Sequence, residues 1–157
     1  MAGRDAKALH AREQGSALHT KAGRGAALTL DGRAEMDSCV MLGDGSTGAA
    51  CGLTTARHPV DVARAVMERT PHVLFSSPSK ERLEEWGVEQ VDPSYFVTER
   101  REAQLEEFKE LEAARQTSAE AQARAQAAED ARHGTVGAVA RDARGLIAAA
   151  TSTGGIT

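Results

Sequence analysis

The sequence predicts a mixed α/β fold, and three observations support this class. Residues 26–41 place Asp31-Gly32 between two apolar stretches, which is a strong signal for a two-residue turn between two strands, with a positive φ at both turn positions. Residues 59–70 carry apolar side chains on one helical face, directly after a proline that suits a first helical turn. Residues 135–153 contain two short runs of small residues around a glycine loop, which favours a buried hairpin.

The remaining elements follow in chain order. A Gly-rich segment leads from residue 42 to Pro59, where the amphipathic helix begins, with Val62, Ala65, Val66 and Arg69 on one face. The apolar run at 72–75 predicts a strand, and 77–87 predicts a capped helix that ends at Gly87. From Ser94 the pattern predicts one long helix through residue 116, with Phe96, Arg100, Leu105, Phe108 and Leu111 at near-helical intervals.

The chain divides into four parts. Residues 1–20 lack periodicity, and we expect them to be poorly ordered. Residues 21–112 hold most of the predicted core. Residues 113–134 have high helix propensity and almost nothing to bury, so a solvated helix or mobile tether is favoured over a coiled coil. Residues 135–157 begin a second portion with the small-residue hairpin.

Composition and charge exclude several classes of function. Of 157 residues only 3% are aromatic and the net charge is −4, so a nucleic-acid or membrane surface is not expected. Cys39 and Cys51 lie in apolar stretches without further ligands at zinc spacing, which favours ordinary buried thiols and no metal site. The first twenty residues lack the apolar run of a signal peptide, and we expect a reducing, cytoplasmic location.

The hairpin fixes a register that has chemical interest. If residues 143–145 form a three-residue loop with Gly145 in the left-handed conformation, Thr135 faces Thr153 and Gly137 faces Thr151. Directly opposed residues share one face, so the two threonine hydroxyls come close to each other. Because both faces lack charge for most of their length, we expect the hairpin at the centre of a sheet with helices on both sides.

A threonine hydroxyl is a weak nucleophile and needs a base, and one source of that base is the α-amino group of the same residue. Thr135 is internal, so its amine becomes available only if the Gly134-Thr135 bond is cut. Glycine before that bond allows strained backbone conformations, and the tether before it allows a break without loss of the fold. From the residues alone, an ordinary core hairpin is an equally good interpretation.

The segments 22–41, 48–74, 95–101 and 134–155 together resemble the plant-type L-asparaginase and isoaspartyl peptidase family. The resemblance implies an αββα sandwich of the N-terminal-nucleophile hydrolase type, incomplete in this chain. It implies cleavage between Gly134 and Thr135, with Thr135 as nucleophile and Thr153 as the neighbouring hydroxyl. Gly137, Thr151, Gly154 and Gly155 would support this hairpin. The implied substrates are L-asparagine and β-aspartyl dipeptides, hydrolysed by a homodimer of cleaved α and β subunits.

The chain also departs from the family's pattern. The family's ion-binding loop differs here at His19, Thr20 and Lys21, so we expect no cofactor, although a structural alkali ion occurs in the family. The sequence ends at Thr157, before the Arg and Asp that clamp the substrate and the Thr-Gly of the oxyanion hole. We therefore expect little or no activity from these 157 residues alone.

Two other interpretations of the sequence compete with that of a hydrolase. A non-catalytic fragment or interaction protein would use the Ala/Glu-rich helix as its contact surface. A nucleotide site is disfavoured, because neither Gly-rich segment carries the Gly-Lys-Ser/Thr of a phosphate loop. Glu35, Asp37 and the charged residues of 99–112 are interpreted as solvated or structural.

Overall fold

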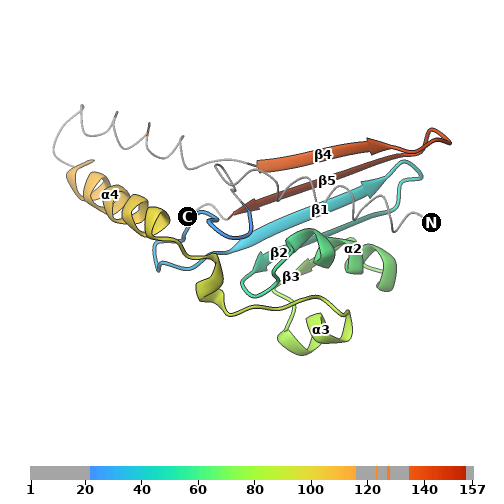
Figure 1. Cartoon of the computed structure of the whole chain (residues 1–157), viewed down its shortest axis with the longest axis horizontal. Helices are drawn as coiled ribbons and strands as arrows, with labels where there is room; N and C mark the ends of the chain where they lie inside the picture. The colour runs from blue at the N-terminus through green and yellow to red at the C-terminus, as the bar shows by residue number, and fades with distance from the viewer. Residues whose placement is uncertain (1–21, 116–122, 124–126, 128–134, 155–157) are drawn as a thin grey trace.

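The structure is a computed structural model that describes residues 22–115 and 135–154, together with the single residues 123 and 127. The described residues form a five-stranded sheet in the order β3-β2-β1-β5-β4 (Figure 1). Its strands are β1 (Met36–Leu42), β2 (Thr47–Leu53), β3 (Leu74–Ser76), β4 (Thr135–Arg141) and β5 (Ile147–Gly154). The helices are α2 (Pro59–Arg69), α3 (Lys80–Glu85) and α4 (Glu99–Arg115). The predicted α/β class is confirmed at this level.

Three tight turns in the fold share one backbone geometry. In each, the residue before the loop pairs with the residue four positions later, and a glycine N–H bonds back to the first carbonyl. The loops are 30–32, 43–45 and 143–145, and their final glycines, Gly32, Gly45 and Gly145, have φ of 77°, 92° and 88°. A three-residue hairpin loop needs this left-handed final residue, and glycine adopts it without steric cost.

The predicted turn at Asp31-Gly32 is present, but its form differs from the expectation. Only Gly32 has a positive φ, so the loop contains three residues, Leu30 to Gly32, and not two. The arm before the turn is reduced to a single antiparallel bridge between Leu28 and Ala34. The long strand starts only at Met36, because that is where pairing with β2 and β5 begins.

Strand β2 was not predicted, because its segment is rich in glycine. It pairs antiparallel with β1 and parallel with β3. Each glycine meets a local requirement and does not break the strand. Gly45 ends the loop, Gly48 lies directly beneath α2, and Gly52 has a φ of 67° at a register shift in the β1–β2 ladder. Glycine in a strand marks such bulges and close approaches.

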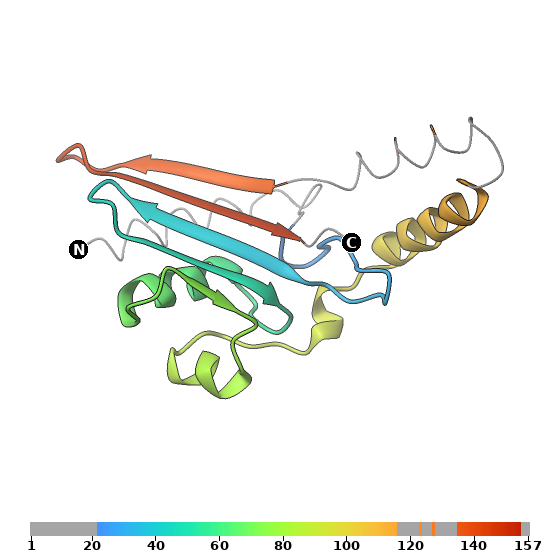
Figure 2. The same ribbon diagram turned by 180° about the vertical axis from the view of Figure 1, so that it is seen from behind.

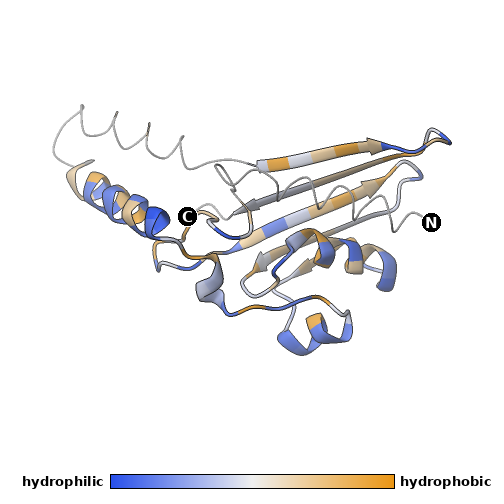
Figure 3. Ribbon diagram, in the orientation of Figure 1, coloured by the Kyte–Doolittle hydropathy of each residue, from blue (hydrophilic) through white to orange (hydrophobic). Residues whose placement is uncertain are grey.

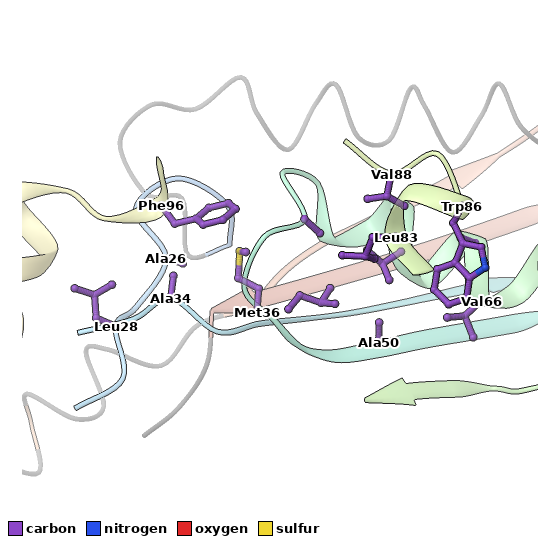
Figure 4. Packing of buried hydrophobic residues seen from close by; sticks show 14 of the residues in the cluster. Ala26, Leu28, Ala34, Met36, Ala50, Val66, Leu83, Trp86, Val88 and Phe96 are labelled. Carbon is purple, nitrogen blue, oxygen red and sulfur yellow. The ribbon is translucent and has the colours of Figure 1, made fainter. Parts of the chain in front are cut away.

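Helix α2 covers one face of the sheet. Pro59 occupies the first turn as predicted, and the helix buries Val60, Val62, Ala63, Ala65 and Val66. The Ser38 hydroxyl donates to the Pro59 carbonyl oxygen at 2.7 Å, which ties β1 to the start of the helix. Figure 4 shows part of the core, where the side chains of Met36, Val66, Leu83, Trp86 and Phe96 are buried.

The other predicted elements are confirmed with one correction. Strand β3 overlaps the predicted apolar run at Leu74 and Phe75 and extends to Ser76, and α3 has Ser79 as its N-cap and ends before Gly87. The long helix begins at Glu99, not at Ser94. Residues Pro93–Phe96 instead form a 3-10 turn, in which the Asp92 carboxylate accepts from the Ser94 N–H at 2.9 Å. This turn buries Phe96 fully and separates it from the helix that follows.

Helix α4 extends away from the sheet (Figures 1 and 2) and shows alternating polar and apolar colours along its length (Figure 3). Its base is attached through buried Leu105 and Phe108 and through Arg101, whose Nε donates to the Gly25 carbonyl at 2.6 Å. Residues 113–115 of the predicted tether belong to this helix. The rest of that tether, apart from residues 123 and 127, and the predicted poorly ordered residues 1–20 lie outside the described residues.

Gly48 gives a direct test of the packing of α2 on the sheet. A Cβ at this position would overlap the Ala63 carbonyl oxygen and lie 2.6 Å from the Met67 backbone nitrogen. We expect Gly48→Ala to destabilise the fold by about 1–3 kcal/mol or more, since backbone atoms must move. Urea unfolding of the wild-type and variant chains measures the difference.

Gly137→Ala is the matched control, because its Cβ would meet the Thr151 Cγ2 at 3.4 Å, an ordinary contact. We expect that variant to lie within about 0.5 kcal/mol of wild type. Equal unfolding midpoints for the two variants would show that the close approach of α2 has been misjudged.

Candidate active site

The β4–β5 loop is held by the carboxylate of the residue that precedes it. Asp142 N–H donates to the Leu146 carbonyl at 2.9 Å, and Gly145 N–H donates to the Asp142 carbonyl at 3.0 Å. The Asp142 Oδ1 accepts from the backbone N–H groups of Arg144 and Leu146 at 2.8 and 2.9 Å. The Arg144 guanidinium also donates to Oδ2 at 3.0 Å. Together these bonds fix the loop at three residues and therefore fix the register of the hairpin.

The predicted register of the hairpin is confirmed. Thr135 pairs with Thr153 and Gly137 pairs with Thr151. Residues opposed in this way have Cα atoms about 4.5–5.5 Å apart and side chains on one face. Thr135 is exposed and Thr153 is half-buried, and the Thr153 hydroxyl donates to the Gly154 carbonyl at 3.2 Å. Gly134 and Gly155, the other predicted site residues, lie outside the described residues.

The predicted central position of the hairpin is wrong for the described sheet. Of the two hairpin strands, β4 lies at one edge of the sheet, and β5 lies between β4 and β1. Small uncharged residues had suggested burial on both faces, yet the Thr135 face is open in the described part of the chain. Val139 on that face is 74% exposed, whereas Ala150 on the opposite face, against α2, is 5% exposed. We call the surface that carries Thr135, Thr153, Val139, Ile147 and Met41 the open face.

Asp37 also lies on the open face, although the sequence did not indicate a role for it in the site. It lies on β1 and pairs directly with Thr153, so Thr135, Thr153 and Asp37 form one row across three strands. Its Oδ1 accepts from the Gly52 backbone N–H at 3.0 Å. Asp37, Cys39 and Met41 alternate along β1 with the buried Met36, Ser38 and Val40, and this alternation of burial is visible only in the structure.

The row ends at an unusual backbone arrangement. Gly52 lies opposite Asp37 at a β-bulge, where two residues of β2 match one residue of β1. Next to it, Ser77 has a φ of 44°, the one positive value among non-glycine residues in the described ranges. The Ser77 N–H donates to the Cys51 carbonyl at 2.8 Å, so this strained residue is hydrogen-bonded to the last part of β2. Such strain persists only where surrounding structure holds it, often near functional sites.

The site lies at one end of the sheet. In Figures 1 and 2 the loops 43–45 and 143–145 lie together at one end, and β4 begins at the other, toward α4. The Gly43 N–H donates to the Ile147 carbonyl at 2.7 Å, which joins the two loops. The Thr135 row is therefore separated from the loops by the length of the strands.

Neither a metal cluster nor a membrane-spanning helix is found in the described residues. No group of three or more His, Cys, Asp or Glu side chains there is arranged to hold an ion. Within the same residues, none of the helices combines the length and apolar character needed to cross a membrane. Cys39 and Cys51 are free thiols as expected, but they are only half-buried and not buried.

Comparison with known proteins identifies the family. A family model described as asparaginase matches residues 6–157. The chain belongs to the asparaginase family. This membership confirms the resemblance noted in the sequence. The matched residues include Thr135, Thr153 and Asp37.

Three relatives show the extent of the similarity. The isoaspartyl peptidase of Salmonella typhimurium is 46% identical over 142 residues, covering 87% of this chain and 43% of the relative. The isoaspartyl peptidase/L-asparaginase of Mus musculus is 39% identical over 137 residues, covering 86% and 39%. A probable isoaspartyl peptidase/L-asparaginase 2 of Arabidopsis thaliana is 36% identical over 152 residues, covering 85% and 46%. The chain spans less than half the length of these curated relatives.

The Asp142 carboxylate gives a testable pH dependence. The pKa of Asp142 lies below its ordinary value of 3.8. The largest cause is the hydrogen bond from the Leu146 N–H, and the bonds from Arg144 lower the pKa further. A depressed folded-state pKa stabilises the fold above the unfolded-state pKa, and this stability is lost as pH falls through the folded-state pKa. We expect an NMR titration of Asp142 to show a midpoint below 3.8.

Arg144→Ala is the control for this titration. It removes the guanidinium but keeps the Leu146 N–H bond, which is the largest cause of the shift, so most of the depression should remain. Asp142→Asn should remove the part of the acid sensitivity of unfolding that this carboxyl contributes. A titration midpoint of Asp142 at or above the ordinary aspartate value would contradict the assigned loop geometry.

Proposed function

We propose that the complete protein containing this chain hydrolyses L-asparagine and β-aspartyl dipeptides with Thr135 as its nucleophile. The observation that carries the proposal is the register that places Thr135, the first residue of β4, directly opposite Thr153. Membership of the asparaginase family supports it, and so do the printed activities of the relatives. Thr135 is also exposed on the open face, where a substrate can approach its hydroxyl.

The proposed nucleophile forms by cleavage of the Gly134-Thr135 bond. Thr135 Oγ attacks the Gly134 carbonyl carbon, and its proton passes to the peptide nitrogen, which leaves as the free Thr135 amine. Water then hydrolyses the resulting ester, which releases the Gly134 carboxylate and restores the Thr135 hydroxyl. This amine titrates near pH 8 and is partly unprotonated at neutral pH, so it serves as the base for the hydroxyl of the same residue. The cut lies before the first paired residue of β4, so no ladder pair of the sheet is broken.

Turnover then follows the same chemistry on a small substrate. Thr135 Oγ attacks the side-chain carbonyl, ammonia or an amino acid leaves with a proton from the Thr135 amine, and water hydrolyses the β-aspartyl ester. The Thr153 hydroxyl stabilises the Thr135 side chain from the facing position. In this scheme, the oxyanion donors and the groups that bind the substrate come from the part of the family's sequence that this chain does not span.

The open face supports the finer fold proposal. Val139, Met41 and Ile147 on this face are 74%, 53% and 49% exposed, which is unusual for large apolar side chains that lie close together on a sheet. We infer that a second sheet packs on this face in the complete protein, which gives the αββα sandwich. The α portion would comprise 21–112 and the connecting 113–134, and the β portion would begin at Thr135, with two such pairs forming a homodimer. A cytoplasmic location fits the unpaired Cys39 and Cys51.

Self-cleavage is the direct test. The complete reading frame is expressed as wild type, Thr135→Ala and Thr135→Ser, and intact masses are measured after prolonged incubation. We expect wild type to separate into two pieces at Gly134-Thr135 and to hydrolyse both substrates. Thr135→Ser should cleave more slowly, and Thr135→Ala should stay intact because it has no hydroxyl.

Two outcomes would refute the nucleophile assignment. One is a wild-type protein that stays in one piece and releases no ammonia from L-asparagine. The other is a Thr135→Ala protein that splits at the same bond. Either result would favour the non-catalytic interaction protein as the function of this chain. The isolated 157-residue chain is expected to have little or no turnover.

A further inference from the structure

We propose that Asp37 is a positioning residue that orients the Thr153 hydroxyl toward Thr135. This inference rests on the proposed function and assigns a role in that site to a third residue. Thr135, Thr153 and Asp37 occupy facing positions on β4, β5 and β1, so their side chains emerge from the same face in one row. Asp37 is half-buried, and it is the carboxylate in this row.

Asp37 is too far from Thr135 to act on it directly. Neighbouring strands lie about 4.8 Å apart, so residues two strands apart are separated by roughly 9–10 Å between Cα atoms. Thr153 lies between them and is within reach of both. Asp37 therefore acts through Thr153 and touches neither the substrate nor the reacting atoms.

The carboxylate of Asp37 is held from the side opposite Thr153. Its Oδ1 accepts from the Gly52 N–H on β2 at 3.0 Å, whereas Thr153 lies on β5. The bulge makes this possible, because the extra residue on β2 leaves the Gly52 N–H to the side chain and not to the ladder. A carboxylate accepts about four hydrogen bonds, so this contact leaves acceptor capacity toward β5.

The backbone around Gly52, which holds the Asp37 carboxylate, is rigid. Gly52 has a φ of 67°, and a Cβ there would lie 2.5 Å from the Ser77 Oγ. Ser77 in turn is fixed by its N–H bond to the Cys51 carbonyl at 2.8 Å. The N–H that holds Asp37 thus comes from a backbone that has little freedom to move. This arrangement places a fixed negative charge beside Thr153.

The Thr153 hydroxyl has one proton to donate, and Asp37 is a better acceptor for it. In this structure the proton goes to the Gly154 carbonyl at 3.2 Å, longer than the usual 2.7–2.8 Å of an O–H···O bond. A bond to a carboxylate is shorter and about twice as strong as one to a neutral acceptor. Rotation about χ1 directs the proton to Asp37, and the oxygen lone pairs of Thr153 then accept from the Thr135 hydroxyl or amine. No covalent bond changes in this step.

Asp37→Asn isolates the charge from the shape. The amide oxygen of the variant still accepts from the Gly52 N–H, so its NH₂ group points toward Thr153 and donates where the carboxylate accepted. The introduced amide then takes one Thr153 lone pair, and the Thr153 proton loses its carboxylate acceptor, so the hydroxyl is no longer oriented toward Thr135. We expect kcat and the rate of self-cleavage to fall by about 10–100-fold, the cost of misplacing a reacting group, with KM changed little.

The matched control is Asp31→Asn in the same reading frame. Asp31 is an exposed acid whose carboxylate pairs with Arg33 at 3.2 Å, away from the Thr135 row. This variant should behave as wild type. If Asp31→Asn lowered the rate as much as Asp37→Asn, a general effect of charge would explain the result and the positioning role would be rejected.

A double-mutant cycle separates positioning from mere stability. In a Thr153→Val background, which keeps the shape and lacks the hydroxyl, Asp37→Asn should cause no further loss of rate. A purely structural role of Asp37 predicts instead that the two losses multiply, and that result would overturn the proposal. A wild-type protein that cleaves and turns over while Asp37→Asn is equally fast would also overturn it, and would leave the proposed function intact.

A readout without activity completes the test. In a crystal structure of the complete Thr135→Ala protein, which cannot cleave, a Thr153 Oγ to Asp37 carboxylate distance within about 3.2 Å supports the proposal. A separation beyond about 3.2 Å overturns it. Because this distance does not depend on catalysis, it tests the role of Asp37 separately from the identity of the nucleophile.

Discussion

The geometry of the candidate site depends on the register of β5. This strand pairs with β4 on one side and with β1 on the other, and both ladders are continuous over seven residue pairs. A slip of one residue in either ladder would move Thr153 to the opposite face relative to its neighbours. The Asp142 carboxylate prevents this slip in the β4 ladder, since it fixes the length of the loop. In the β1 ladder, the Gly43 N–H bond to the Ile147 carbonyl fixes the same alignment from the loop end.

The covered face of the sheet is built from small residues that let α2 approach closely. Gly48 leaves space for the backbone of the helix, and Ala50, Ala150 and Ser38 lie on the same face. Larger side chains at these positions would hold the helix away from the sheet. Larger apolar side chains pack instead at the part of the sheet near α3, where the rings of Phe75 and Trp86 pack edge to face with centroids 5.2 Å apart.

The sequence predicted local features well, since their causes lie within a few residues. The loop at 143–145 and the pairing of Thr135 with Thr153 followed from the position of one glycine, and α2 followed from Pro59 and the apolar face after it. Strand β2 was missed because glycine is usually unfavourable in strands, and its reasons here are contacts with α2 and Ser77, which are distant in sequence. The edge position of β4 was also missed, because strand order depends on pairing between residues 36–42 and 148–154. Asp37 could not be singled out without knowing that order.

The ladder between β1 and β5 would join two separate polypeptides if the chain is cut before Thr135. Strand β1 would then belong to one polypeptide, and the β4–β5 hairpin to the other, so that a pairing inside the sheet becomes a contact between two molecules. Separation of the pieces would expose the interior of the sheet, and dissociation and unfolding would be a single event. The stability of the mature protein would therefore depend on protein concentration, as for an obligate complex, even though it is made as a single chain.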